Sequence, residues 1–449
     1  MFKEKVKKYL TDYRYIISVQ ILGMLILRDL IQDVFYLFSG IQSTVWNAFS
    51  AFVSLFALCI FLYEAVHRKL LTSPIQNTLW VFFAITFVGT AMRREGLWIK
   101  SWIYEFLLFM KIYLFFILIP RFGKGETDKF LYRISKWCIA VFCTINTVSL
   151  LILILHLLGF PDFPGAFAYS SMVTTSNHDG QYQFYGLYEW MTDGSYRTVT
   201  ALVLGLFLYS RRQLKPALYY LNLVTAVSYL LLAKARSGLL CLIPIALYGI
   251  FFVLQKWKNR KFAKTVLLSL LVLGAIAIAI KAGPKLYTLR VLRTTDVYAF
   301  ESQMNSITNG RFMMWEAGIQ VGMEKPVFGW GWAYLPAKLV EMTFNDAGIS
   351  LHNILVNVFV FSGFAGLISL LVFFFASIVR FWRNRHLIAS TKSGWLLILV
   401  LCGWIQSMLQ PGILGENSHI ESIYFWIAYG YLIYLDYGTD SVSKAAVQA

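Results

Sequence analysis

Charged residues are scarce in this chain: Asp, Glu, Lys and Arg make up 14% of its 449 residues. Soluble domains carry roughly 25% of such residues. Hydrophobic residues make up 58% of the sequence, and apolar runs recur along its whole length. Runs of about 20 apolar residues are long enough to cross a bilayer as helices. The composition therefore excludes a set of soluble domains and predicts an all-α integral membrane protein.

Several signatures of nucleotide and metal chemistry are also missing. The sequence has no GxxxxGK[ST] phosphate-binding loop, which argues against an ATP-driven pump. It has no HExxH motif, no other His–carboxylate cluster at metal-ligand spacing, and no Asp-x-Asp pair. The five cysteines fall within apolar runs and form no CxxC pair, which favours small core residues. We therefore predict no metal and no cofactor, and expect any transfer chemistry to use a donor that already resides in the membrane.

Twelve apolar segments are candidate membrane-spanning helices. If the N-terminus is cytoplasmic, 25 of the 40 lysines and arginines lie in inside segments and 12 in outside segments. This asymmetry predicts that both termini are cytoplasmic, and it indicates that the net charge of +17 is topogenic rather than a nucleic-acid-binding face. The sixth segment is too short to cross unless the preceding TDGSY joins it. The segments run over residues 13–36, 44–63, 75–91, 102–119, 137–158, 197–210, 217–232, 237–254, 265–281, 353–378, 394–410 and 420–436.

We expect residues 1–449 to form one polytopic domain that ends in a polar cytoplasmic tail, residues 437–449. The longest connector, residues 282–351, is predicted to lie outside the membrane on the extracytoplasmic face. Loops this long are usually functional or disordered. An Asn-Gly turn at 309–310 precedes GRFMMWEAGIQVGM, which is typical of an amphipathic helix. This connector is therefore expected to be folded.

A second outside connector, residues 159–196, is rich in aromatic residues. Rings such as Tyr182, Tyr185 and Trp190 could stack on sugar faces. An interfacial aromatic belt would have the same composition. The sequence leaves both interpretations open.

Cations at the expected outer face are candidate ligands for phosphate. Lys234 and Arg236 occupy the tight turn LLAKARSGLL, and Arg311 opens the amphipathic helix with Trp315 one turn later on the same face. The planar fork of arginine binds phosphate oxygens bidentately. Interfacial snorkelling is the alternative for each arginine.

Ionisable residues inside the expected spans are a separate group of functional candidates. Arg28 and Asp29 are adjacent in the first span and could pair with neighbouring helices. Lys111 lies near mid-depth, where a lipid-phosphate contact and a buried ion pair are both open. At the outer boundary, His352 and Asn353 stand where the long connector enters the tenth span. A histidine there can titrate near neutral pH, face water and still be held by the helix. Asn353 could brace this junction as a cap.

Three motifs together resemble the bacterial O-antigen ligase and polymerase superfamily, which are integral membrane glycosyltransferases acting on polyprenyl-linked sugars. The similarity is concentrated in residues 225–375. The motifs are Ala235-Arg236-Ser237-Gly238; Asn309-Gly310-Arg311 with Trp315 and then Lys325-Pro326, Gly329 and Gly331; and His352-Asn353 followed after nine residues by Gly363 and Gly366.

The resemblance implies an enzyme of the bacterial inner membrane whose active site lies on the extracytoplasmic face. Its donor is a glycan on undecaprenyl pyrophosphate, whose anomeric carbon is attacked with inversion by a hydroxyl of a glycan or lipid acceptor. Arg236 and Arg311 would hold the pyrophosphate, and His352 would be the general base. The other substrate-binding candidates are Lys234, Trp315 and Asn353. Expected partners are these substrates, membrane lipids and polysaccharide-assembly proteins, but not nucleic acid.

The resemblance leaves open whether the enzyme is a ligase or a polymerase. Two other functions fit the hydropathy. One is a lipid-linked oligosaccharide flippase or other transporter, which should line a path through the membrane with polar groups. The other is a wall transglycosylase of the cell-shape family, which would depend on a carboxylate such as Asp296, Glu301 or Glu316.

Overall fold

The computed structural model of the chain describes thirteen stretches and some scattered positions between them. The expected segment 265–281 and the tail 437–449 lie outside the described residues, as do Asn309, Trp190 and parts of the expected segment 44–63. The described stretches are residues 13–32, 51–56, 74–92, 98–117, 124–163, 167–175, 182–188, 191–254, 296–308, 310–332, 351–409, 413–414 and 420–433.

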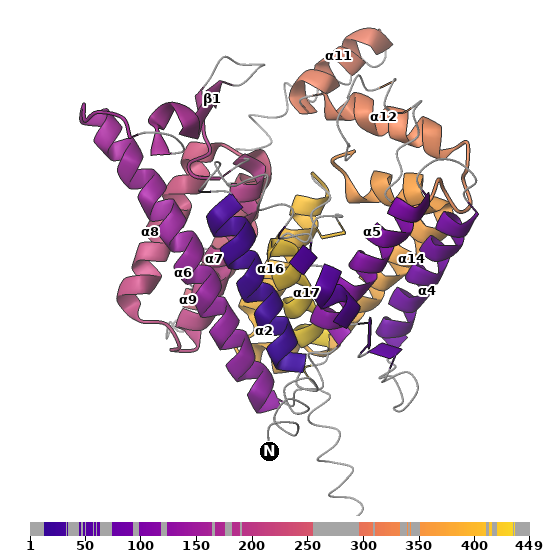
Figure 1. Cartoon of the computed structure of the whole chain (residues 1–449), viewed down its shortest axis with the longest axis horizontal. Helices are drawn as coiled ribbons and strands as arrows, with labels where there is room; N and C mark the ends of the chain where they lie inside the picture. Colours follow the sequence, from indigo (N-terminus) through magenta and orange to yellow (C-terminus); the bar gives the residue numbers. More distant parts are fainter. Residues whose placement is uncertain are drawn as a thin grey trace, which may run out of the picture.

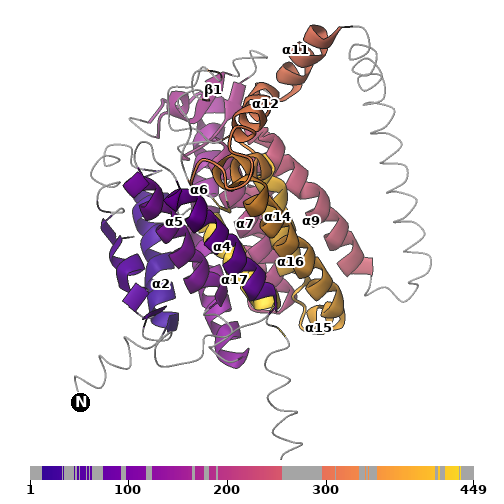
Figure 2. The ribbon, with the colours of Figure 1, turned by 90° about the vertical axis from the view of Figure 1, so that its right-hand side faces the viewer.

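Helices make up most of the described structure. Their apolar stretches pack side by side, while α11 and α12 lie beyond one end of the other helices (Figures 1 and 2). The helices are α2 (Tyr13–Gly23), which continues as the π-helical η1 (Met24–Gln32), α4 (Pro74–Ala91), α5 (Trp98–Ile112), which continues as η3 (Tyr113–Ile117), α6 (Lys124–Leu157), α7 (Met191–Ser210), α8 (Pro216–Ala233), α9 (Arg236–Leu254), α11 (Val297–Thr308), α12 (Arg311–Gly322), α14 (Ile354–Arg383), α15 (Arg385–Ser390), α16 (Gly394–Ser407) and α17 (Ile420–Ile433).

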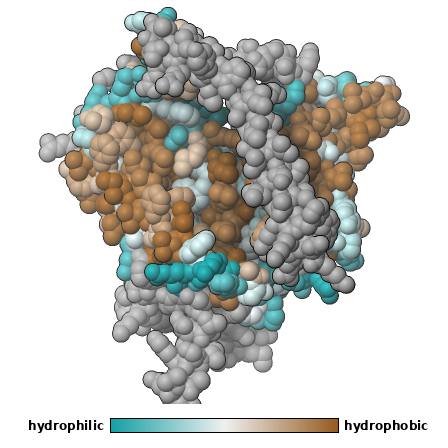
Figure 3. Space-filling model, turned by 180° about the vertical axis from the view of Figure 1, so that it is seen from behind, coloured by the Kyte–Doolittle hydropathy of each residue, from teal (hydrophilic) through white to brown (hydrophobic). Residues whose placement is uncertain are grey.

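Three described helices are long and apolar enough to cross a membrane: Gly125–Leu157, Pro216–Ala233 and Ile354–Arg383. Four shorter apolar helices accompany them, at Ile75–Ala91, Arg236–Phe252, Gly394–Ser407 and Ser422–Ile433. An apolar band lies between hydrophilic rims on the face shown in Figure 3. These features confirm a helical membrane protein, whereas the count of twelve spans remains a prediction.

The lipid-facing side of α14 illustrates why the band is apolar. Ile368, Val372 and Phe375 are 58%, 48% and 59% exposed, and they follow one another at helical spacing. A contiguous apolar stripe of this kind is unfavourable in water and is suited to hydrocarbon. The opposite side of the helix is buried, with Leu370 and Phe373 in the core.

The expectation of an all-α chain needs one correction, because the aromatic connector contains a small antiparallel hairpin. A 3-10 turn, η6 (Tyr169–Met172), leads into β1 (Val173–Thr175), which pairs with β2 (Tyr182–Phe184). Each strand has three residues, too few to show an alternating pattern in the sequence. The β-branched residues of β1 and the aromatic residues of β2 nevertheless suit strands.

The residues after the hairpin insert into the helical bundle. Phe184, Leu187 and Tyr188 are buried. The Tyr188 hydroxyl donates to Asn146 Oδ1 at 2.9 Å, and the Leu187 N–H donates to Ser149 Oγ at 3.0 Å. This part of the connector is therefore packed against α6. The predicted roles of Tyr182 and Trp190 stay predictions, because Trp190 and the side chain of Tyr182 lie outside what the structure describes.

Helix α7 begins at Met191 and so includes the TDGSY segment, which lengthens it to 20 residues. Arg197, the first residue of the expected sixth segment, lies inside this helix with 2% of its side chain exposed. Its Nε is 3.0 Å from Oδ1 of Asp29, which is fully buried. The predicted pairing of the Arg28–Asp29 segment with a neighbouring helix is thus confirmed. Lys111 is also buried, and its Nζ donates to Ser422 Oγ at 3.5 Å.

Helix α14 is broken at Gly363, where the backbone is left-handed (φ 63°, ψ −165°). A non-glycine residue is strained at this φ, and an added Cβ would clash with the carbonyl oxygen of Val327. The break frees backbone groups that must find partners within the protein. The loop after α12 supplies them: Phe364 N–H donates to Pro326 O, Ala365 N–H to Val327 O, Trp330 N–H to Val360 O and Gly331 N–H to Phe361 O, at 2.7–3.1 Å.

Candidate functional site

The turn between α8 and α9 presents Lys234 and Arg236 at the surface. Lys234 is the C-cap of α8 in the left-handed conformation (φ 53°), and Arg236 is the first residue of α9. Ala235 and Ser237 are buried, while Lys234 and Arg236 are exposed. This alternation fixes the turn against the bundle and directs both cations outward, as the sequence predicted for a tight turn.

Arg311 opens α12, which confirms the predicted helix in the long connector. Gly310 caps the helix with φ 78°, and Asn305 Oδ1 accepts a hydrogen bond from the Met313 N–H at 2.8 Å. One turn further on, the indole N–H of Trp315 donates to the carbonyl of Leu351 at 2.9 Å. Helix α12 is thereby tied to the residue that precedes His352.

His352 lies in a short segment that is held from both sides. Its own backbone is left-handed (φ 50°), a conformation that is uncommon for a non-glycine residue and is found at functional sites. Asn353 caps α14, because its Oδ1 accepts from the N–H groups of Leu355 and Val356 at 2.9 and 3.2 Å. Its Nδ2 donates to the Met408 carbonyl at 3.2 Å. The prediction that Asn353 braces this junction as a cap is confirmed.

Electrostatics brings three of the predicted site residues together. Burial lowers the pKa of His352 to about 4, and the positive charge of Arg311 contributes to this shift. Burial also lowers the pKa of Arg311, and the neighbouring charge of Arg236 lowers it further. Exposed charges interact appreciably only within about a Debye length, roughly 10 Å at 0.1 M salt. Arg236, Arg311 and His352 therefore share one neighbourhood although they come from three separate segments.

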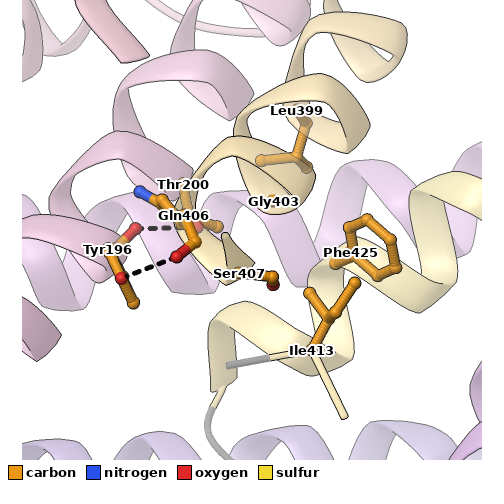
Figure 4. Close-up of a pocket in the computed structure, with 8 residues that line it drawn as sticks. All are labelled: Tyr196, Thr200, Leu399, Gly403, Gln406, Ser407, Ile413 and Phe425. Atoms are coloured by element: carbon orange, nitrogen blue, oxygen red, sulfur yellow. Dashed lines mark hydrogen bonds between the residues drawn. The ribbon is translucent and has the colours of Figure 1, made fainter. Parts of the chain in front are cut away.

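Tyr196 is a neighbour of this group that the sequence did not indicate. It is buried at the start of α7, and it is close enough to Arg311 to influence the pKa of that side chain. Its hydroxyl donates to the carbonyl of Gln406 at 3.1 Å, across 210 positions of sequence (Figure 4). No local pattern could have linked Tyr196 to α16.

The carboxylates that the sequence offered as alternative bases lie at the start of α11, on α11 and on α12. Asp296 directly precedes α11, and its Oδ1 accepts from the Ala299 N–H at 3.2 Å. Glu316 is exposed on α12, next to Trp315 but outside the packed face of that helix. Neither is among the groups whose charge acts on His352.

Two comparisons with known proteins found similar sequences. Residues 221–371 match the family model described as O-antigen ligase. An uncharacterized protein of Haemophilus influenzae is 24% identical over 197 residues, which cover 41% of this chain and 49% of that protein. The matched region spans about half the length of that relative. The residues that match this family model contain all three motifs, with Arg236, Arg311 and His352, so this region of the chain is similar to the O-antigen ligase family.

Proposed function

We propose that this protein is a membrane glycosyltransferase that moves an oligosaccharide from undecaprenyl pyrophosphate to a hydroxyl of an acceptor sugar, with inversion and without a metal. The family match supports glycosyl transfer in a membrane. The observation that carries the finer proposal is the convergence of Arg236 and Arg311 on the neighbourhood of His352. Two guanidinium groups beside one imidazole suit a reaction that releases a pyrophosphate and removes a proton from the acceptor hydroxyl.

In this reaction the acceptor oxygen attacks the anomeric carbon, and the bond from that carbon to the pyrophosphate oxygen breaks. Arg236 and Arg311 bind the pyrophosphate through their planar forks and stabilise the charge that develops on the leaving group. His352 takes the acceptor proton as the new glycosidic bond forms. Because its pKa is about 4, its imidazole is neutral at physiological pH and able to accept that proton.

The role of His352 is tested by His352→Gln, which keeps a polar side chain but lacks a comparable base. General-base catalysis is typically worth about 10²- to 10⁴-fold in rate, so transfer should fall by that factor while donor binding persists. His386→Gln is the matched control, because His386 is exposed on α15, which follows the opposite end of α14. A purified His352→Gln protein that transfers glycan at a near wild-type rate would exclude His352 as the base.

The role of the two arginines is tested by Arg236→Lys and Arg311→Lys, which keep the charge but lose the bidentate fork. Glycan assembly should fall substantially in either variant at normal protein abundance. Arg385→Lys is the control, since Arg385 is exposed, stacks on Trp382 and should tolerate the change. Near-normal assembly in both site variants would show that these arginines are interfacial anchors.

A glycan-transfer assay with the purified protein also separates transfer from transport. A flippase moves the intact lipid-linked oligosaccharide and forms no glycosidic bond, so the glycan would stay on the original lipid. A wall transglycosylase that depends on a carboxylate would lose activity in Glu316→Gln and keep it in His352→Gln. We expect covalent product from the wild type and little effect of Glu316→Gln.

A further inference from the structure

The outer end of α16 contacts both sides of the proposed site. The Gln406 carbonyl accepts from Tyr196, which lies beside Arg311. The Met408 carbonyl accepts from Asn353, which directly follows His352. The last turn of α16 therefore lies between the arginine side and the histidine side.

A small cavity opens against this turn, between α7, α16 and α17, and it has room for about one water molecule. Polar side chains line one part of it and apolar residues the rest (Figure 4). The lining residues are Tyr196, Thr200, Leu399, Gly403, Gln406, Ser407, Ile413 and Phe425.

Two hydrogen-bond donors in this cavity are not used within the described part of the chain. Gln406 is 6% exposed and Ser407 is 0% exposed. Gln406 Nε2 and Ser407 Oγ are buried, and neither has a hydrogen-bond partner among the residues that the structure describes. Tyr196 and Thr200 differ, because their hydroxyls donate to the carbonyls of Gln406 and Tyr196. Buried donors without acceptors are unfavourable, so two in one cavity call for an acceptor.

We propose that Gln406 Nε2 and Ser407 Oγ form a donor pair that binds one phosphate oxygen of the lipid-linked donor. This inference rests on the proposed function and extends its binding site beyond the arginines. The cavity shares Tyr196 with the neighbourhood of Arg311, and its other lining residues, Thr200, Leu399 and Gly403, continue along α7 and α16 towards the middle of these apolar helices.

A lipid-linked pyrophosphate must cross this same boundary. Its sugar-side phosphate faces the acceptor, and its lipid-side phosphate lies nearer the hydrocarbon. Neutral amide and hydroxyl donors can hold a phosphate oxygen there without adding a buried charge. In this arrangement Arg236 and Arg311 bind the sugar-side phosphate, and the donor pair binds an oxygen of the lipid-side phosphate.

The test compares Gln406→Leu, Ser407→Ala and the double variant with wild type in detergent. The KM for the undecaprenyl-pyrophosphate-linked oligosaccharide should rise about tenfold or more in each single variant, as expected for a lost bond to a charged group. The inhibition constant of sugar-free undecaprenyl pyrophosphate should rise by the same factor. The acceptor KM and kcat should change little, because this contact is present before and during transfer.

The thermal stability of the donor-free protein distinguishes a substrate site from a water site. Replacing donors that have no acceptor should leave the melting temperature unchanged or raise it. Thr200→Val is the matched control, because Thr200 lines the same cavity while its hydroxyl is satisfied within α7 at 2.9 Å. Its donor KM should match wild type.

An unchanged donor KM in Gln406→Leu and Ser407→Ala would overturn the proposal. If the melting temperature of these donor-free variants is also lower than that of wild type, the cavity is assigned to a structural water. A wild-type protein that performs no transfer would instead refute the proposed function, so the two failures are distinguishable.

Discussion

Titration of His352 tests the proposed site, because burial and the Arg311 charge lower its pKa from 6.5 to about 4. At pH 6 an imidazole with a pKa of 6.5 is roughly three quarters protonated, whereas one with a pKa of 4 is about 1% protonated. The difference corresponds to about 3 kcal/mol in favour of the neutral form. Since the neutral form accepts the proton, kcat/KM for transfer, which follows the titration of the donor-free protein, should persist at pH 6 and decline only as the pH falls towards 4.

The perturbation is Arg311→Gln, which removes the cation and leaves the burial. The part of the shift that comes from charge should disappear, so the pKa of His352 should rise but stay below 6.5, since burial is the larger cause. Lys325→Gln is the control: this cation of the same connector lies 4.0 Å from the centre of the Trp330 ring and is not among the charges that act on His352.

The assay is NMR of histidine-labelled protein in detergent, followed from pH 8 to pH 3. The signal of His352 is assigned by its absence from the spectrum of His352→Gln. We expect a midpoint near 4 in the wild type, a higher midpoint in Arg311→Gln and no change in Lys325→Gln. A wild-type midpoint near 6.5, or one that Arg311→Gln leaves in place, would refute the shared neighbourhood of these two side chains.

Three further predictions concern the structure around the site. Asn353→Ala removes the cap of α14 and the hydrogen bond to the Met408 carbonyl. The free energy of unfolding should therefore fall by about 1 kcal/mol. An unchanged melting temperature would contradict the role of Asn353 as a cap. Gly363→Ala requires a left-handed alanine against a backbone carbonyl, so size-exclusion chromatography should recover little folded protein, whereas Gly125→Ala, which meets nothing within 4 Å, should behave as wild type. In a variant without the five native cysteines, a cysteine introduced at Asp346, which lies outside the described residues, should react with an impermeant thiol reagent in spheroplasts. Labelling only after membrane disruption would place residues 282–351 on the cytoplasmic side.

The parts of the fold that could be predicted from the sequence are those set by local patterns. Hydropathy located most of the described apolar helices, because burial in a bilayer needs a continuous apolar run. The Asn-Gly turn and the residues after it predicted α12, and the position of Asn353 before an apolar run predicted its cap. The inclusion of the TDGSY segment in α7 could be predicted from the minimum length of a membrane-spanning helix.

The parts that could not be predicted depend on contacts between distant segments. The sequence carries the spacing from His352 to Gly363, but only the structure shows that Gly363 breaks α14 and that the loop after α12 satisfies the freed backbone groups. Tyr196 reaches α16 across 210 positions, and Arg197 pairs with Asp29 from the first helix. Each of these contacts depends on tertiary packing, which cannot be predicted from the local periodicity of apolar residues.

In the proposed reaction, the charge that weakens the base is also the charge that holds the donor. Without donor, Arg236 and Arg311 act unfavourably on each other, and Arg311 disfavours a proton on His352. A bound pyrophosphate would offset both cations, and a nearby negative charge raises the pKa of a histidine. A general base works best when its pKa lies near the working pH. His352 would therefore become an effective base only after the donor is in place, which couples activation of the acceptor to binding of the lipid-linked sugar.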